Sequence, residues 1–90
     1  MELLTTTAEM LLAIGDESGL TPRAYATQKS GSPDMNRLRR IDDLIESGLV
    51  SAEETQYRGR PVRKLTLTVK GNLVYTLLRG VREILKEGSP

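Results

Sequence analysis

Glycine and proline divide the first half of this 90-residue chain into three helical segments. A hydroxyl residue stands directly before a proline twice, in Thr21-Pro22 and in Ser32-Pro33. Such pairs are typical of helix starts, because the hydroxyl caps the first amides and proline fits the first turn. Glycine favours helix ends and follows each segment: Gly19, Gly31 and Gly48. The pattern predicts three helices, over residues 2–17, 22–30 and 33–47.

The third segment, 33–47, has two chemically different faces if each residue turns by ~100°. Its apolar residues share one side: Leu38, Ile41 and Ile45, bordered by Met35 and Leu44. Its polar residues share the opposite side: Asn36, Arg39, Arg40, Asp43 and Ser47. Arg37 lies at the border, beside Leu44. We expect Ser32 to cap this helix and Asp34 to favour its positive end.

Two stretches in which apolar and polar residues alternate follow Gly48, and they predict a β-hairpin. The alternating apolar residues are Val50 and Ala52 in the first stretch and Leu65, Leu67 and Val69 in the second. The sequence Arg-Gly-Arg-Pro, residues 58–61, lies between the two stretches. Glycine and proline suit a loop, so this tetrapeptide is expected at the tip of the hairpin.

A last helix over 69–87, capped by Thr68, carries a broad apolar face. One domain of this size has a small core, so the face is wider than the core requires. The surplus predicts a homodimer contact made by Leu73, Leu77, Leu78, Val81, Ile84 and Leu85. The alternative is that the first helix covers the whole face.

The net charge of +1 conceals two basic blocks. Residues 23–40 and 55–70 are basic, and the block between them, 41–54, holds five acids and no base. The second basic block contains four cations around one glycine and one proline: Arg58, Arg60, Arg63 and Lys64. Because like charges repel, such a cluster favours an acidic partner. Both basic blocks could serve one polyanion if they fold onto the same face.

Residue types that are absent exclude several functions. The chain has no histidine and no cysteine, which removes the commonest general base, thiol nucleophiles and thiolate metal sites. We therefore expect no enzymatic activity, no metal and no cofactor. No apolar run approaches the ~18 residues of a membrane span. The first ten residues lack the basic region of a signal peptide, so we expect a cytoplasmic protein.

The predicted order of elements resembles a winged helix-turn-helix domain. The stretch "LRRIDDLIESGLV" is similar to the recognition helix and following strand of MarR-type and PadR-type transcriptional regulators, and "LTLTVKG" is similar to their exit from the wing. The resemblance covers about residues 8 to 75. It implies an α+β fold with a three-helix core, a two-stranded wing and a C-terminal helix, in one domain over 1–90. No stretch resembles a pocket for a small-molecule ligand.

The resemblance also implies which residues contact double-stranded DNA. The helix over 33–47 would enter the major groove with Ser32, Asn36, Arg37, Arg39 and Arg40. The tip sequence is similar to the core of an AT-hook, so the wing tip, residues 58–64, would meet the minor groove of A·T-rich DNA through Arg58, Gly59 and Arg60. Arg63 and Lys64 of the same tip would hold phosphates. The amides after Thr21, with Arg23 and Lys29, could hold a phosphate.

A dimeric, sequence-specific, nucleoid-associated repressor is the function that these features favour, since 90 residues leave little room for an activation or sensor domain. Two alternatives remain open. A protein-interaction module would keep the fold without the basic face. An architectural DNA-binding protein would keep the wing and would not need Asn36.

Overall fold

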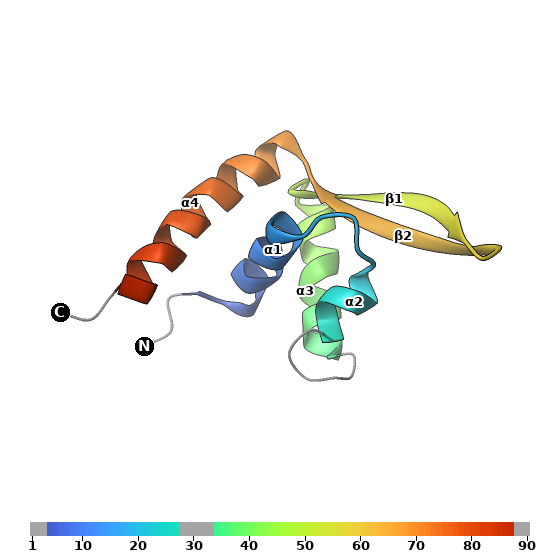
Figure 1. The fold of residues 1–90 in the computed structure, drawn as a ribbon, viewed down its shortest axis with the longest axis horizontal. Helices are drawn as coiled ribbons and strands as arrows, with labels where there is room; N and C mark the ends of the chain where they lie inside the picture. The colour runs from blue at the N-terminus through green and yellow to red at the C-terminus, as the bar shows by residue number, and fades with distance from the viewer. Residues whose placement is uncertain (1–3, 28–33, 88–90) are drawn as a thin grey trace.

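The computed structural model describes residues 4–27 and 34–87. The elements in chain order are α1 (Thr6–Asp16), α2 (Pro22–Thr27), α3 (Met35–Glu46), β1 (Val50–Tyr57), β2 (Arg60–Leu67) and α4 (Val69–Glu87). The two strands form one antiparallel hairpin. Figure 1 shows that α1, α2 and α3 form the body, that the hairpin projects from one side of it, and that α4 extends on the other side. The predicted order and type of the elements are confirmed.

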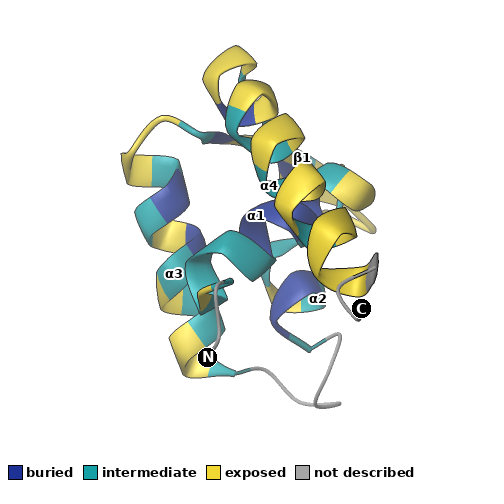
Figure 2. Ribbon diagram, turned by 90° about the vertical axis from the view of Figure 1, so that its left-hand side faces the viewer, coloured by how far each residue is buried: buried dark blue, intermediate teal, exposed yellow. Residues whose placement is uncertain are grey.

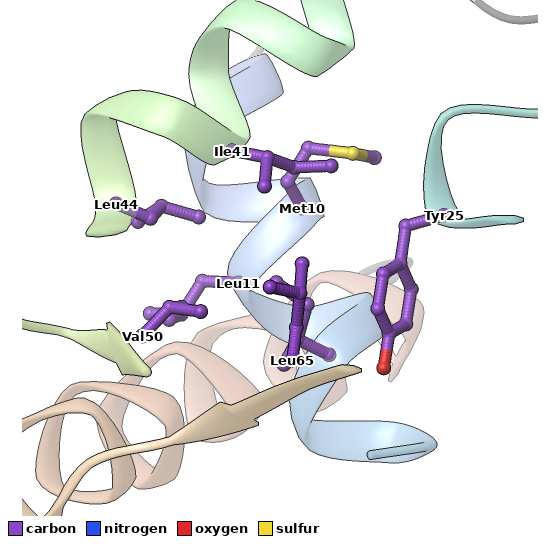
Figure 3. Close-up of a cluster of buried hydrophobic side chains, with 8 residues drawn as sticks. Met10, Leu11, Tyr25, Ile41, Leu44, Val50 and Leu65 are labelled. Carbon is purple, nitrogen blue, oxygen red and sulfur yellow. The ribbon is translucent and has the colours of Figure 1, made fainter. Parts of the chain in front are cut away.

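Eight buried side chains form one core between the helices and the base of the hairpin (Figure 3): Met10, Leu11, Ile14, Tyr25, Ile41, Leu44, Val50 and Leu65. Each of the first three helices and each strand contributes at least one of them. The core therefore fixes the base of the hairpin relative to α3. Val74 and Leu78 of α4 pack against this core from outside.

Tyr25 is the core residue that the sequence analysis missed. Its ring is fully buried. Its hydroxyl donates a hydrogen bond to the carbonyl of Glu17 at 2.5 Å and accepts one from the amide of Leu20 at 3.2 Å. Desolvation by burial raises the pKa of Tyr25 above its usual value. The sequence does contain a sign of this role, because Tyr25 is the one aromatic residue in a short polar helix. Its hydroxyl joins that helix to the end of α1.

The start of α3 differs from the prediction. The helix begins at Met35 and not at Pro33, because the carboxylate of Asp34 accepts the amide N–H of Asn36 at 2.9 Å and caps it. Met35 does not border the apolar face as predicted, since it is 70% exposed. Ser32, the cap that the sequence analysis expected, lies outside the described residues.

The other helix starts are closer to expectation. Thr21 caps α2 as predicted, with its hydroxyl accepting the amide N–H of Ala24 at 3.2 Å. Helix α1 begins later than predicted, at Thr6, because Thr5 caps it by accepting the amide N–H of Ala8 at 3.2 Å. The predictions for Lys29, Gly31 and Pro33 fall outside the described residues.

Main-chain bonds join the hairpin to the connection between α1 and α2. The amide of Gly19 donates to the carbonyl of Leu65 at 2.8 Å, and the amide of Leu65 donates to the carbonyl of Leu20 at 2.9 Å. Gly19 has a φ of 90°, a left-handed conformation that suits glycine at a helix end. These bonds hold β2 beside the helices at the buried end of the hairpin.

The start of α4 is fixed against the start of β1. Thr68 caps the helix, accepting the amide N–H of Gly71 at 3.0 Å, and its own hydroxyl donates to the carbonyl of Gly48 at 2.6 Å. The amide of Thr68 donates to the carbonyl of Leu49 at 3.1 Å. Val69 is exposed, so the inward alternation predicted for β2 stops at Leu67.

Gly71→Ala should destabilise the fold. A Cβ at Gly71 would overlap the carbonyl of Leu49, which is backbone and cannot move aside alone. We expect the free energy of unfolding in urea to fall by about 2 kcal/mol, as for other overpacked sites. Asn72→Ala, at the exposed neighbouring position, is the control and should change it by less than about 0.5 kcal/mol. Equal free energies of unfolding for Gly71→Ala and Asn72→Ala would contradict the close contact between Gly71 and Leu49.

Candidate nucleic-acid interface

The outward face of α3 divides into two halves of opposite character. In the N-terminal half, Asn36 and Arg39 are exposed and Arg40 is partly exposed. Three acids follow on the outward side of the C-terminal half: Asp42, Asp43 and Glu46. A polyanion is therefore attracted to the N-terminal half and repelled by the C-terminal half.

Arg40 is held along the helix by neighbours on both sides. Its Nη1 donates to the carboxylate of Asp43 at 2.9 Å, and its Nε lies 3.5 Å from the side-chain oxygen of Asn36. A surface pair of this kind contributes only ~0.2 to 0.5 kcal/mol to the helix. It leaves Arg40 on the exposed side next to Asn36, with its guanidinium oriented across the helix.

Arg37 does not lie on this exposed face, although the sequence analysis grouped it with the groove-facing residues. Its side chain is only 15% exposed, and its Nε lies 3.8 Å from the carboxylate of Asp34. Arg37 lines a hollow together with residues of α1 and with Arg82 of α4. Its border position, beside the buried Leu44, explains this direction.

The hollow is a feature that the sequence analysis did not predict. It has a volume of about 390 Å³ and is lined by Leu4, Glu9, Met10, Leu12, Ala13, Asp16, Glu17, Arg37 and Arg82. Within the described residues, Nη1 of Arg37 and Nε of Arg82 are buried and have no hydrogen-bond partner. The three acids in the lining outnumber the two arginines, so the hollow as a whole does not favour an anion.

The tip of the hairpin is a two-residue turn made by Arg58 and Gly59. Both have positive φ, 52° and 76°, as a type I′ turn requires. Arginine is an unusual choice at such a position, because a side chain there is strained and asparagine or glycine is preferred. The guanidinium of Arg58 lies over the ring of Tyr57, 5.4 Å from its centre, and both residues are exposed.

The four cations of the hairpin do not share one tip, which corrects the sequence analysis. Arg60 lies next to the turn and pairs with Tyr57. Further along β2, Arg63 stands opposite Glu54 and Lys64 stands opposite Glu53. Neighbouring residues of a strand point to opposite faces, so these two cations cannot bind the same phosphate side by side. The cationic tip consists of Arg58, Gly59 and Arg60.

Two further predicted contacts, Thr21 and Arg23, lie at the start of α2, whereas Lys29 and Ser32 lie outside the described residues. Arg23 is exposed in the first turn of α2, and the hydroxyl of Thr21 is occupied by the cap.

Within the described residues, no cluster of acidic side chains could hold a metal ion. The same part of the chain contains no helix with the length and apolarity needed to cross a bilayer.

Much of helix α4 is exposed (Figure 2). Its exposed apolar residues form a stripe along the helix: Leu73, Leu77, Val81, Ile84 and Leu85. The most exposed member, Leu77, is 73% exposed. Helix α1 therefore does not cover the whole apolar face, which was the alternative reading of the sequence. Leu78, predicted with the stripe, instead packs against the core of its own chain. Gly80 is also exposed, and a Cβ there would meet no described atom within 4 Å.

Three polar side chains, here called the α1–α4 clamp, join the two helices: Asp16, Tyr75 and Arg82. Arg82 donates from Nη1 to one oxygen of Asp16 at 2.7 Å and from Nη2 to the other at 3.0 Å. The hydroxyl of Tyr75 donates to Asp16 at 2.7 Å. The hydrogen bond from Arg82 is the main cause that holds the pKa of Asp16 below its usual value, against a smaller rise from desolvation.

The clamp predicts a pH dependence of stability. Because the pKa of folded Asp16 lies below the unfolded value of 3.8, its contribution is present above that value and is lost as pH falls through the folded pKa. The free energy of unfolding should be higher for the wild type than for Asp16→Asn at about pH 6, and the difference should shrink below about pH 4. Urea titrations of both proteins measure this. A difference that grows toward low pH would contradict the assignment.

Searches against protein-family models and against curated proteins find no match. Solved structures do match. The chain is similar to smu.1704 from Streptococcus mutans UA159, with a TM-score of 0.74 and 15% identity over 92% of this chain and 83% of that one. It is also similar to the transcriptional regulator SlyA, with a TM-score of 0.69 and 19% identity over 92% of this chain and 55% of that one.

A third structure, Streptococcus pneumoniae FabT in complex with DNA, matches with a TM-score of 0.65 and 20% identity over 88% of this chain and 54% of that one. This chain thus spans about half the length of the SlyA and FabT chains. The likeness establishes the predicted fold: the chain is an α+β winged helix-turn-helix domain.

Proposed function

We propose that this protein is a dimeric transcriptional regulator that binds double-stranded DNA in a sequence-specific manner and acts as a repressor. The observation that carries the proposal is the pair of exposed polar and cationic surfaces at the N-terminal half of α3 and at the tip of the hairpin. Both lie away from α4 (Figure 1), so DNA and a second subunit would occupy different parts of the molecule. The solved structure of FabT, a chain with the same fold, contains DNA, which is a partner of the proposed kind.

The chemistry of the α3 surface suits the major groove. Asn36 can donate to and accept from one adenine, and arginine can donate twice to one guanine. Asn36, Arg39 and Arg40 lie within two turns at the start of the helix, the end whose residues contact bases in helix-turn-helix proteins. The acids of the C-terminal half would be kept at a distance from the phosphates by the tilt of the helix.

The wing tip suits the minor groove. Arginine inserted in a narrow minor groove is attracted by its negative potential, which is strongest in A·T-rich DNA. Arg58 keeps its charge at a turn position that favours glycine or asparagine, and strained residues of this kind cluster at functional sites. Glycine at position 59 would allow a close approach to the sugar edges. Arg23 would contact a flanking phosphate.

The stripe on α4 supports the homodimer. Leu73, Leu77 and Ile84 are each about two-thirds or more exposed, which is costly in a monomer. A two-fold symmetric contact would bury the same stripe of both subunits at once. Gly80 lies on the stripe side, and nothing in the described part of its own chain requires glycine there, whereas a close partner helix would.

Repression by occupying promoter DNA needs only binding, and these surfaces support binding. The experiment is a selection of duplexes from a random library by the purified protein, followed by sequencing. We expect enrichment of two half-sites related by a two-fold axis and separated by about one helical turn, some 34 Å. Enrichment of A·T-rich duplexes without a defined motif would favour the architectural alternative. No enrichment at low salt would overturn DNA binding altogether.

A further inference from the structure

Helix α4 is attached to the rest of the chain at two separated places. The first is its start, where Thr68 and Gly71 meet Gly48 and Leu49. The second is the α1–α4 clamp, in which Arg82 lies about 16 Å further along the helix at ~1.5 Å per residue. Two attachments at this separation determine the direction of a rigid rod. The core contacts of Val74 and Leu78 lie between them.

The clamp is closely fitted on the α1 side. A Cβ at Gly15 would overlap the ring of Tyr75, so glycine at this position is what allows the ring to lie against α1. The ring brings its hydroxyl to Asp16, and Arg82 binds the same carboxylate through two nitrogens. A bidentate arginine–carboxylate pair fixes orientation as well as distance.

We infer that the α1–α4 clamp sets the distance between the two α3 helices of the dimer and thereby selects the spacing of the DNA half-sites. This inference rests on the proposed function, because it needs the second subunit on α4 and DNA on α3. Asp16, Tyr75 and Arg82 act as positioning residues and do not touch DNA. Tyr75 and Arg82 lie about 140° round the helix from the centre of the apolar stripe at ~100° per residue, so a partner can cover the stripe without displacing the clamp.

The size of the effect follows from the geometry of a lever. Ile84 lies about 20 Å along α4 from Gly71 at ~1.5 Å per residue. A pivot of about 10° at the start of the helix would move that end by about 3.4 Å, which equals the rise of one base pair. A small freedom of α4 relative to the core is therefore enough to change the preferred spacing by a whole base pair.

The first test measures the dimer without DNA. The chain has no cysteine, so Glu46→Cys at the end of α3 gives one spin label per subunit. Pulsed electron resonance then reports a single distance between the two α3 helices. We expect a narrow distribution for the parent protein and one at least about twofold broader for Arg82→Met, since a helix released at one end can pivot. Tyr75→Phe, which removes only the hydroxyl, should broaden it less.

Lys70→Met is the matched control, because it removes one exposed cation of α4 that takes no part in the clamp. Its distribution should equal that of the parent protein. Equal widths for Arg82→Met, Asp16→Asn and the parent protein would overturn the inference. If the experiment detects no distance between two spin labels, the inference and the proposed dimer are both overturned.

The second test uses the duplex obtained by selection, with one base pair inserted between its half-sites or removed from there. Each change alters the separation by about 3.4 Å and the relative rotation by about 34°. The parent protein should lose at least about tenfold in affinity, and Arg82→Met less than about threefold, while both bind a single half-site equally. A narrow distance distribution in a protein that binds no duplex would refute the proposed function and the selection of half-site spacing, and would support only the role of the clamp in fixing the distance between the α3 helices. Unchanged discrimination in Arg82→Met would refute the clamp and leave DNA binding intact.

Discussion

Replacing both Arg58 and Arg60 by alanine is expected to weaken binding to the selected duplex on the order of 100-fold, since each charge-assisted contact contributes about 1.5 kcal/mol. The slope of log affinity against log salt should fall by about two units, one for each cation removed from the DNA surface. Fluorescence anisotropy at several salt concentrations measures both quantities. The fold should survive, because both side chains are exposed and lie outside the core.

The control for this variant removes two cations from α4, Arg79→Ala with Lys86→Ala, and changes the net charge equally. It should alter the salt slope by less than about half a unit, because these residues lie away from the proposed DNA surface. The same loss in both double variants would mean that binding depends on net charge and not on the wing.

Arg58→Gly separates function from stability at the tip. Glycine adopts the positive φ of this turn without strain, so the free energy of unfolding should rise by about 1 kcal/mol while the affinity for DNA falls. Urea unfolding and anisotropy on the same protein measure the two effects. A loss of stability together with unchanged affinity would mean that Arg58 serves the hairpin and not a ligand.

Leu77→Glu is expected to convert the dimer to a monomer. The side chain is 73% exposed within one subunit, so the subunit itself should stay folded. In a dimer the carboxylate would be buried without a partner at a cost of several kcal/mol, which raises the dissociation constant at least about 100-fold. Sedimentation equilibrium measures the dimer, and the two-half-site duplex should then bind no better than one half-site.

Asn72→Glu adds the same charge at an exposed position about 150° round α4 from the stripe and serves as the control. It should leave the dimer intact. Dissociation of both variants would point to charge repulsion along the helix and would contradict a contact through the apolar stripe.

The fold was predictable from local patterns because each element has its own signals. Thr21 and Thr68 cap helices as expected, Gly19 and Gly48 adopt the left-handed conformation, and the alternation around Val50 and Leu65 puts these two residues in the core. The start of α3 was less predictable, since Ser32 and Asp34 are both good caps by residue type and the sequence alone does not rank them.

The candidate site was predictable where a single element determines it. Helical periodicity puts Asn36 and Arg39 on the outward face of α3, and the same periodicity leaves Arg37 ambiguous until α1 is packed beside it. The pairing of Arg63 with Glu54 needs the register of the hairpin, which follows from the two-residue turn. The clamp joins residues far apart in the chain, and no local pattern indicates such a contact.

The most direct test of the central claim is the ratio of affinities for the selected duplex and for a scrambled duplex of the same composition, measured by competition at about 0.15 M salt. If α3 recognises base sequence, the ratio of the two affinities should be ~10³ or more for the wild type. Asn36→Ala should reduce it by about 10-fold or more while the salt slope stays unchanged. A wild-type ratio of only a few-fold on every selected duplex would contradict sequence-specific regulation. The wing would then bind DNA while α3 would not recognise its sequence.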